Sequence, residues 1–61
     1  MFNAKNHTPV ISINQTFVKC KVKIKGERNL RCLLFTRMFG WQTLYFSPIP
    51  KDKILKWKYD N

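Results

Sequence analysis

The stretch FVKCKVKIK at residues 17–25 decides the fold, because from Val18 onward its apolar side chains alternate with lysines. Alternation with a period of two places one set of side chains on each face of a β-strand. On a helix the same lysines would spread around the circumference. The stretch therefore predicts a strand with one apolar face and one basic face. The basic set is Lys19, Lys21, Lys23 and Lys25.

Shorter strands are predicted on both sides of this stretch. They are Val10–Ile13, Leu30–Arg37, Trp41–Phe46 and Ile54–Tyr59. Glycines and prolines between them favour turns, and residues 51–53 suit a turn or one helical turn. The last segment is short and rich in lysine, so a helix is its alternative. Five short strands predict a mostly β fold, either a small curled antiparallel sheet or an SH3-like five-stranded barrel.

The length of 61 residues suits one domain with a small core. Residues 1–8 are polar and without periodicity, which predicts a flexible N-terminal arm, and residues 9–61 form the single small β domain. The segments Leu30–Arg37 and Trp41–Phe46 carry apolar side chains on both faces. Either closure of a barrel or formation of a homodimer would bury the second face.

The charge of the chain indicates an anionic partner. Twelve Lys and Arg residues against three Asp and Glu give a formal net charge of +9. Such self-repulsion destabilises a compact state, and binding of a polyanion relieves it. No apolar run approaches the ~20 residues of a membrane span, and no signal peptide is visible. We therefore expect a cytoplasmic protein whose partner is nucleic acid or an acidic protein surface.

The pairing of residues 17–25 with the next strand decides what accompanies the lysines. If residues 26–28 form the loop, Lys25 lies opposite Asn29 and Cys20 lies opposite Leu34. A shift by one residue would turn Arg31 and Arg37 toward the core, which is costly without partners. In the preferred register Cys20 and Cys32 lie diagonally on the apolar face, where we expect two reduced thiols rather than a disulfide.

This register predicts a binding face for nucleic acid. The candidate phosphate ligands are Lys19, Lys21, Lys23, Lys25, Arg31 and Arg37. Phe35 lies among them as a candidate for stacking on bases, assisted by Trp57 or Tyr59 of the last strand. Nothing resembles a helix that reads bases, so the expected target is RNA or single strands. The alternative is that the lysines only keep an exposed strand soluble.

No motif for catalysis, metal or cofactor binding is present, and we expect a protein that is not an enzyme. His7 is the only histidine, the two cysteines lack further zinc ligands, and no carboxylates are paired. A basic nuclease acting through Lys, Tyr or His7 is a remaining alternative. A second alternative is a small inhibitor or regulator that docks on an acidic surface of a larger protein. The abundant Lys, Asn, Ile and Phe suggest an AT-rich genome, such as that of a phage.

Overall fold

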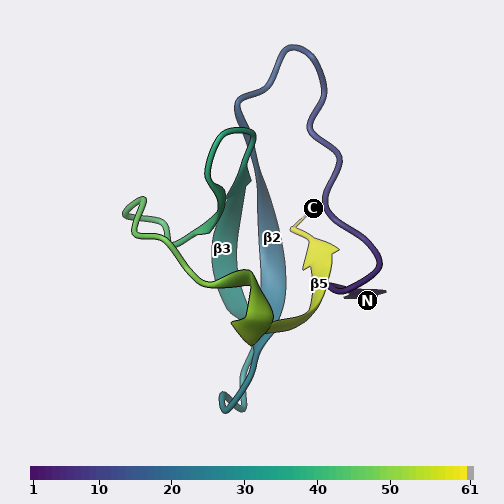
Figure 1. The fold of residues 1–61 in the computed structure, drawn as a ribbon, viewed down its shortest axis with the longest axis vertical. Coiled ribbons are helices and arrows are strands. Elements are labelled where there is room, and N and C mark those ends of the chain that lie inside the picture. Colours follow the sequence, from purple (N-terminus) through teal and green to yellow (C-terminus); the bar gives the residue numbers. More distant parts are fainter. Residues whose placement is uncertain (61) are drawn as a thin grey trace.

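The alternating stretch forms β2 (Phe17–Ile24), the central strand of a five-stranded antiparallel sheet (Figure 1). The computed structural model describes residues 1–60. The strands are arranged in the order β1-β5-β2-β3-β4. Their bounds are Phe2–Asn3 for β1, Arg31–Thr36 for β3, Gly40–Gln42 for β4 and Ile54–Tyr59 for β5. The prediction of a mostly β protein is confirmed.

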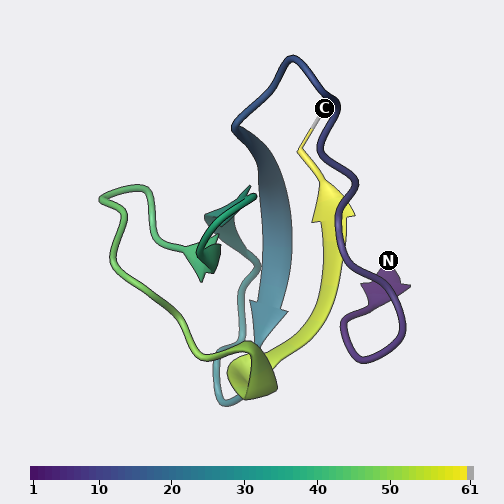
Figure 2. The same cartoon turned by 45° about the horizontal axis from the view of Figure 1, so that its top comes forward.

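The sheet is curled but not closed into a barrel. Its end strands β1 and β4 pair only with β5 and β3 in the sheet, not with each other. The ladder between β2 and β5 shifts between Lys23 and Ile24, where Leu55 is the extra residue. A bulge of this kind bends the strand and increases its twist. Figure 2 shows β2 and β5 curving side by side while the short strands lie at an angle to them.

The predicted elements differ from the observed ones where pairing with distant parts of the chain decides whether a segment forms a strand. β5 is a strand rather than a helix, and Lys51–Lys53 forms the expected single turn, a 3-10 helix. The strand expected over Trp41–Phe46 ends at Gln42, because the chain turns back on itself from Thr43. The strand expected over Val10–Ile13 is wrong: these residues pair with no strand, and Ile13 is 91% exposed.

Residues 1–8 lie against β5, where the sequence suggested only an arm. Phe2 lies opposite Trp57 in the ladder, and the two rings pack with their centroids 4.6 Å apart. The indole Nε1 of Trp57 donates a hydrogen bond of 2.9 Å to the carbonyl oxygen of His7. Farther along, the backbone N–H of Val10 donates to the hydroxyl of Tyr59. The N-terminal segment therefore contributes an edge strand and covers Trp57.

The register between β2 and β3 is shifted by one residue from the predicted one. Cys20 lies opposite Leu33 and Val22 lies opposite Arg31. The expected penalty does not arise, because Arg31 is at the exposed end of β3 and forms an ion pair with Glu27 at 3.3 Å. The observed register turns Leu33 and Phe35 toward the core, which buries more apolar surface.

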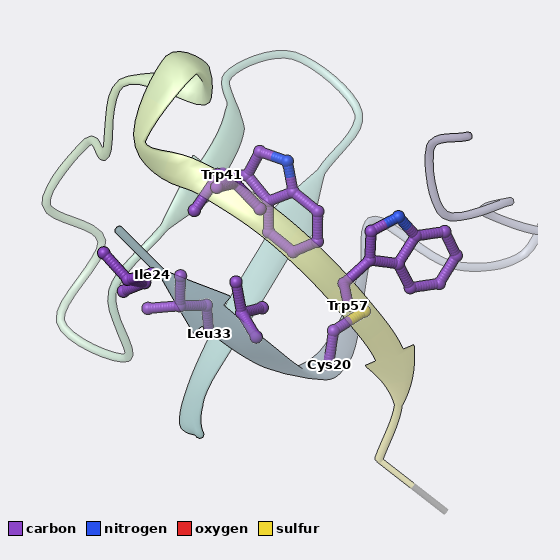
Figure 3. Close-up of a cluster of buried hydrophobic side chains, with 7 residues drawn as sticks. Cys20, Ile24, Leu33, Trp41 and Trp57 are labelled. Carbon is purple, nitrogen blue, oxygen red and sulfur yellow. The ribbon is translucent and has the colours of Figure 1, made fainter. Parts of the chain in front are cut away.

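The core lies on one face of the sheet and is centred on two tryptophans (Figure 3). Trp41 and Trp57 come from β4 and β5, and their ring centroids are 6.3 Å apart. The buried cluster consists of Cys20, Val22, Ile24, Leu33, Trp41, Ile54 and Trp57. Leu34 is also buried, at 4% exposure, on the opposite face. Both apolar faces of β3 are thus buried within one chain.

In residues 1–60 there is no helix with the length and apolar character that crossing a membrane requires.

Candidate nucleic-acid interface

The face of the sheet opposite the tryptophans carries five lysines from two neighbouring strands. Side chains of residues directly opposite each other in a ladder lie on the same face. Since Val22 and Trp57 are opposite each other and both buried, the residues that alternate with them face the other way. We call this surface the lysine face. It consists of Lys19, Lys21 and Lys23 of β2 with Lys56 and Lys58 of β5.

Two pairs of these lysines are directly opposed across the β2–β5 ladder. Lys21 lies opposite Lys58, and Lys23 lies opposite Lys56. Opposed residues have Cβ atoms about 4.5–5.5 Å apart, and like charges in this arrangement destabilise a sheet. Asp60 directly follows β5, and its carboxylate accepts a hydrogen bond from the Cys32 thiol at 3.6 Å. In the described part of the chain no acidic side chain pairs with these lysines.

Lys23 differs from the other four lysines. Its Nζ donates hydrogen bonds to the carbonyl oxygens of Glu27 and Arg28, so it holds the turn between β2 and β3. The other four side chains are exposed. The opposed pair of Lys21 and Lys58 is therefore the part of the face most open to an anion.

The other predicted cations lie away from this surface. Arg31 shares its face with Val22, and Glu27 neutralises it. Arg37 lies beyond the end of β3, and its guanidinium donates to the carbonyl oxygens of Ser12 and Gln15, holding the loop before β2. Lys25 follows the end of β2 and is exposed in the turn region. The structure thus brings together three of the six predicted phosphate ligands.

The predicted stacking residues belong to the core side. Phe35 lies opposite Trp41, and the two rings pack edge to face with centroids 4.9 Å apart. Trp57 is 1% exposed, and the half-buried Tyr59 packs its ring edge against it. The placement of Phe35 among the lysines was wrong because it depended on the wrong register. By alternation along β2, Phe17 shares the face of the lysines and is 41% exposed, and it is the only aromatic residue of β2, β3 and β5 on this face.

Lys56 and Lys58 were missed as site residues. Their alternation was visible in the sequence, but their place beside β2 depends on pairing between segments that are far apart along the chain. No local pattern indicates which neighbour β5 takes. The useful signal is that β2 and β5 have the same alternation of apolar residues and lysines.

An apolar groove of about 1030 Å³ opens on the core side of the sheet. Phe35, Trp41 and Ile54 are among the side chains that line it, between the N-terminal segment and the region of β4. Lys5, Lys51 and Asp52 also line it, and so does Lys56, although its ladder position assigns its side chain to the lysine face. An apolar lining with a few charged groups is typical of a ligand or docking site.

The two cysteines lie on opposite faces of the sheet, not diagonally on one face as predicted. Cys20 is in the core opposite Leu33, whereas Cys32 lies opposite Lys21. Both are free thiols. Burial, followed by the nearby Cys32 and Asp60, raises the pKa of the Cys20 thiol from 9.0 to about 11. Cys20 is therefore protonated at neutral pH and a poor nucleophile.

Residues 1–60 contain no group of three His, Cys, Asp or Glu side chains arranged to hold a metal ion. No protein-family model, curated protein or solved structure matches this chain. The geometry of the two faces therefore carries the functional argument alone.

Proposed function

We propose that this protein binds RNA or single-stranded nucleic acid through the lysine face. The observation that carries the proposal is the direct opposition of Lys21 to Lys58 and of Lys23 to Lys56. Lysines that only keep a protein soluble can lie anywhere on its surface, and opposed pairs are a costly place for them. A bound polyanion turns this repulsion into attraction.

The layout of the lysine face suits a linear polyanion. Along each strand the lysines repeat every second residue, about 6.8 Å apart, and the two rows are about 4.8 Å apart. The result is a basic stripe along β2 and β5, the two long neighbouring strands visible in Figure 2. Lysine binds phosphate as a point charge, without demanding a fixed geometry. Binding with weak sequence preference is the expected outcome.

Single strands or RNA are the favoured targets. The one helix in residues 1–60 has three residues, Lys51–Lys53, which is too short to read bases in a major groove. Recognition of unpaired nucleic acid needs a basic surface and exposed aromatic side chains instead. Tyr45 and Phe46 are 90% and 62% exposed.

The test is a titration of labelled, unstructured RNA and DNA oligonucleotides, followed by fluorescence anisotropy at 50 and 200 mM salt. If four or five lysines each neutralise a phosphate, affinity should fall about 50- to 130-fold between these concentrations. The purified protein should also lose 260 nm absorbance relative to 280 nm after a high-salt wash. Undetectable binding at low salt, or affinity that does not change with salt, would contradict the proposal.

The apolar groove favours a second candidate, in which the protein is an inhibitor or regulator of a larger protein. Three lysines and one aspartate line the groove, which suits an acidic segment with an apolar anchor. A partner that remains bound after nuclease treatment should then be released by Lys51→Glu and retained by Lys21→Gln. Release by Lys21→Gln with retention by Lys51→Glu would exclude the groove as its site.

A further inference from the structure

The loop of residues 43–47, which we call the aromatic loop, is held in one shape by its own hydrogen bonds. The backbone N–H of Thr43 donates to the carbonyl oxygen of Ser47 at 2.8 Å, and that of Phe46 donates to the carbonyl oxygen of Thr43 at 2.9 Å. The Thr43 hydroxyl accepts from the N–H groups of Tyr45 and Ser47. A loop pinned at this many points presents its side chains in a defined direction.

Phe46 carries backbone strain within this loop. Its φ of 64° is the only positive value at a residue other than glycine in residues 1–60. A bulky side chain rarely adopts this conformation, and strain of this kind concentrates at functional sites. The strain does not serve core packing, because Phe46 is 62% exposed. The Nε2 of Gln42, a residue only 8% exposed, donates to the carbonyl oxygen of Phe46 and holds it in place.

The aromatic loop borders the lysine face. Lys19 lies opposite Leu34, and Leu34 lies opposite Gln42, so these side chains form one row across β2, β3 and β4 on the lysine-bearing side. The hydrogen bond from Gln42 joins the aromatic loop to the end of that row. Figure 1 shows the loop as the green segment projecting beyond β3 on the side away from β5. Two sheet spacings, about 10 Å, separate the backbones of β2 and β4.

We infer that the aromatic loop stacks on unpaired bases of a nucleic acid whose phosphates lie on the lysine face; this inference rests on the proposed function. Tyr45 is the main stacking residue, since its side chain is 90% exposed and the loop fixes its backbone. At a rise of 3.4 Å per stacked nucleotide, about three nucleotides span the distance between β2 and β4. Every base has a flat aromatic surface, so stacking adds affinity for single strands without demanding a sequence.

The experiment compares Tyr45→Ser, Tyr45→Phe and Met38→Ser with the wild-type protein. Each is titrated with an unstructured 12-nucleotide RNA and with a duplex of the same length, at several salt concentrations. Met38 is the matched control, because it is 82% exposed on the preceding turn and belongs to no proposed site. Circular dichroism and thermal melting of each variant verify that the fold is retained, as expected for exposed positions.

Tyr45→Ser should weaken single-strand binding at least about fivefold and leave duplex binding unchanged, because a duplex offers no unpaired base. Tyr45→Phe and Met38→Ser should bind like the wild type. The slope of affinity against salt should stay constant, since Tyr45 neutralises no phosphate. Wild-type binding that Tyr45→Ser leaves intact would overturn the stacking inference alone, and leave the loop free to contact a protein. Failure of the wild type to bind any oligonucleotide would overturn the proposed function as well.

Discussion

Replacing the opposed pair Lys21 and Lys58 by glutamine should raise the stability of the domain and weaken its binding to nucleic acid. The two lysines lie directly opposite each other without an acidic partner in residues 1–60. Removing one like-charge cross-strand pair stabilises a sheet by about 0.2–1 kcal/mol. For a domain of this size the melting temperature should rise by about 1–8 °C at low salt.

The loss of binding can be worked out from the same two charges. Each phosphate contact on a single strand contributes about 0.7 to the slope of log affinity against log salt. Losing two contacts should reduce the slope by about 1.4, which corresponds to an affinity about 25-fold lower at 0.1 M salt. Anisotropy titrations of one unstructured RNA at four salt concentrations give the slope, and melting followed by circular dichroism gives the stability.

The control is the double variant Arg28→Gln and Lys53→Gln, which lowers the net charge from +9 to the same +7. Both residues are exposed, and neither has a lysine as its ladder partner. This variant should lose little affinity and gain little stability. If both double variants lost affinity equally, net charge rather than the lysine face would account for binding. If the first variant neither gained stability nor changed its salt slope, the reasoning from opposed lysines would be refuted.

Three further predictions concern the fold. Trp57→Phe should lower the free energy of unfolding by about 1–3 kcal/mol, because the carbonyl of His7 loses its buried donor; thermal melting measures this, and an unchanged melting temperature would contradict it. Cys20 ionises in the unfolded chain at a lower pH than in the folded one, since its folded pKa is raised to about 11. Stability should therefore fall as pH rises from about 9 to 11, and this component of the fall should vanish in Cys20→Ala. Gly40→Ala should lower the free energy of unfolding by about 1 kcal/mol or more, because Gly40 has a φ of 72°, which alanine rarely adopts. Denaturant unfolding measures this, and an unchanged free energy of unfolding would contradict the expected strain.

The sequence predicts those elements whose signal is local. β2 follows from its strict alternation, and β5 from the same pattern at the end of the chain. β1 cannot be found this way, because Phe2 forms a strand only by pairing with Trp57 at the far end of the sequence. The Val10–Ile13 run has suitable residues for a strand but pairs with no strand of the sheet. Composition alone does not show that difference.

The candidate site was predicted in part for the same reason. Lys19 and Lys21 follow from alternation within one strand, but which residues of β3 and β5 lie beside them depends on register. The predicted register was chosen to keep Arg31 out of the core. The chain avoids this cost differently, by placing Arg31 at the end of a strand beside Glu27. One residue of shift then moved Phe35 from the basic face to the tryptophan side and brought Cys32 to the lysines.

The corrected pairing changes what the lysines imply. A single basic strand beside neutral neighbours is sufficiently explained by solubility. Solubility does not explain two strands whose lysines are opposed in register. Shifting β5 by one residue would expose Trp57, so the register cannot change to separate the charges. Replacing one lysine by a neutral polar residue would remove the repulsion without any change of register. Core packing thus fixes the register, but it does not require lysine at both Lys21 and Lys58. A small domain with limited stability retains a repulsion that one glutamine would remove. Under the proposed function, the advantage of that repulsion lies in the bound state, where a polyanion between the two rows contacts both at once.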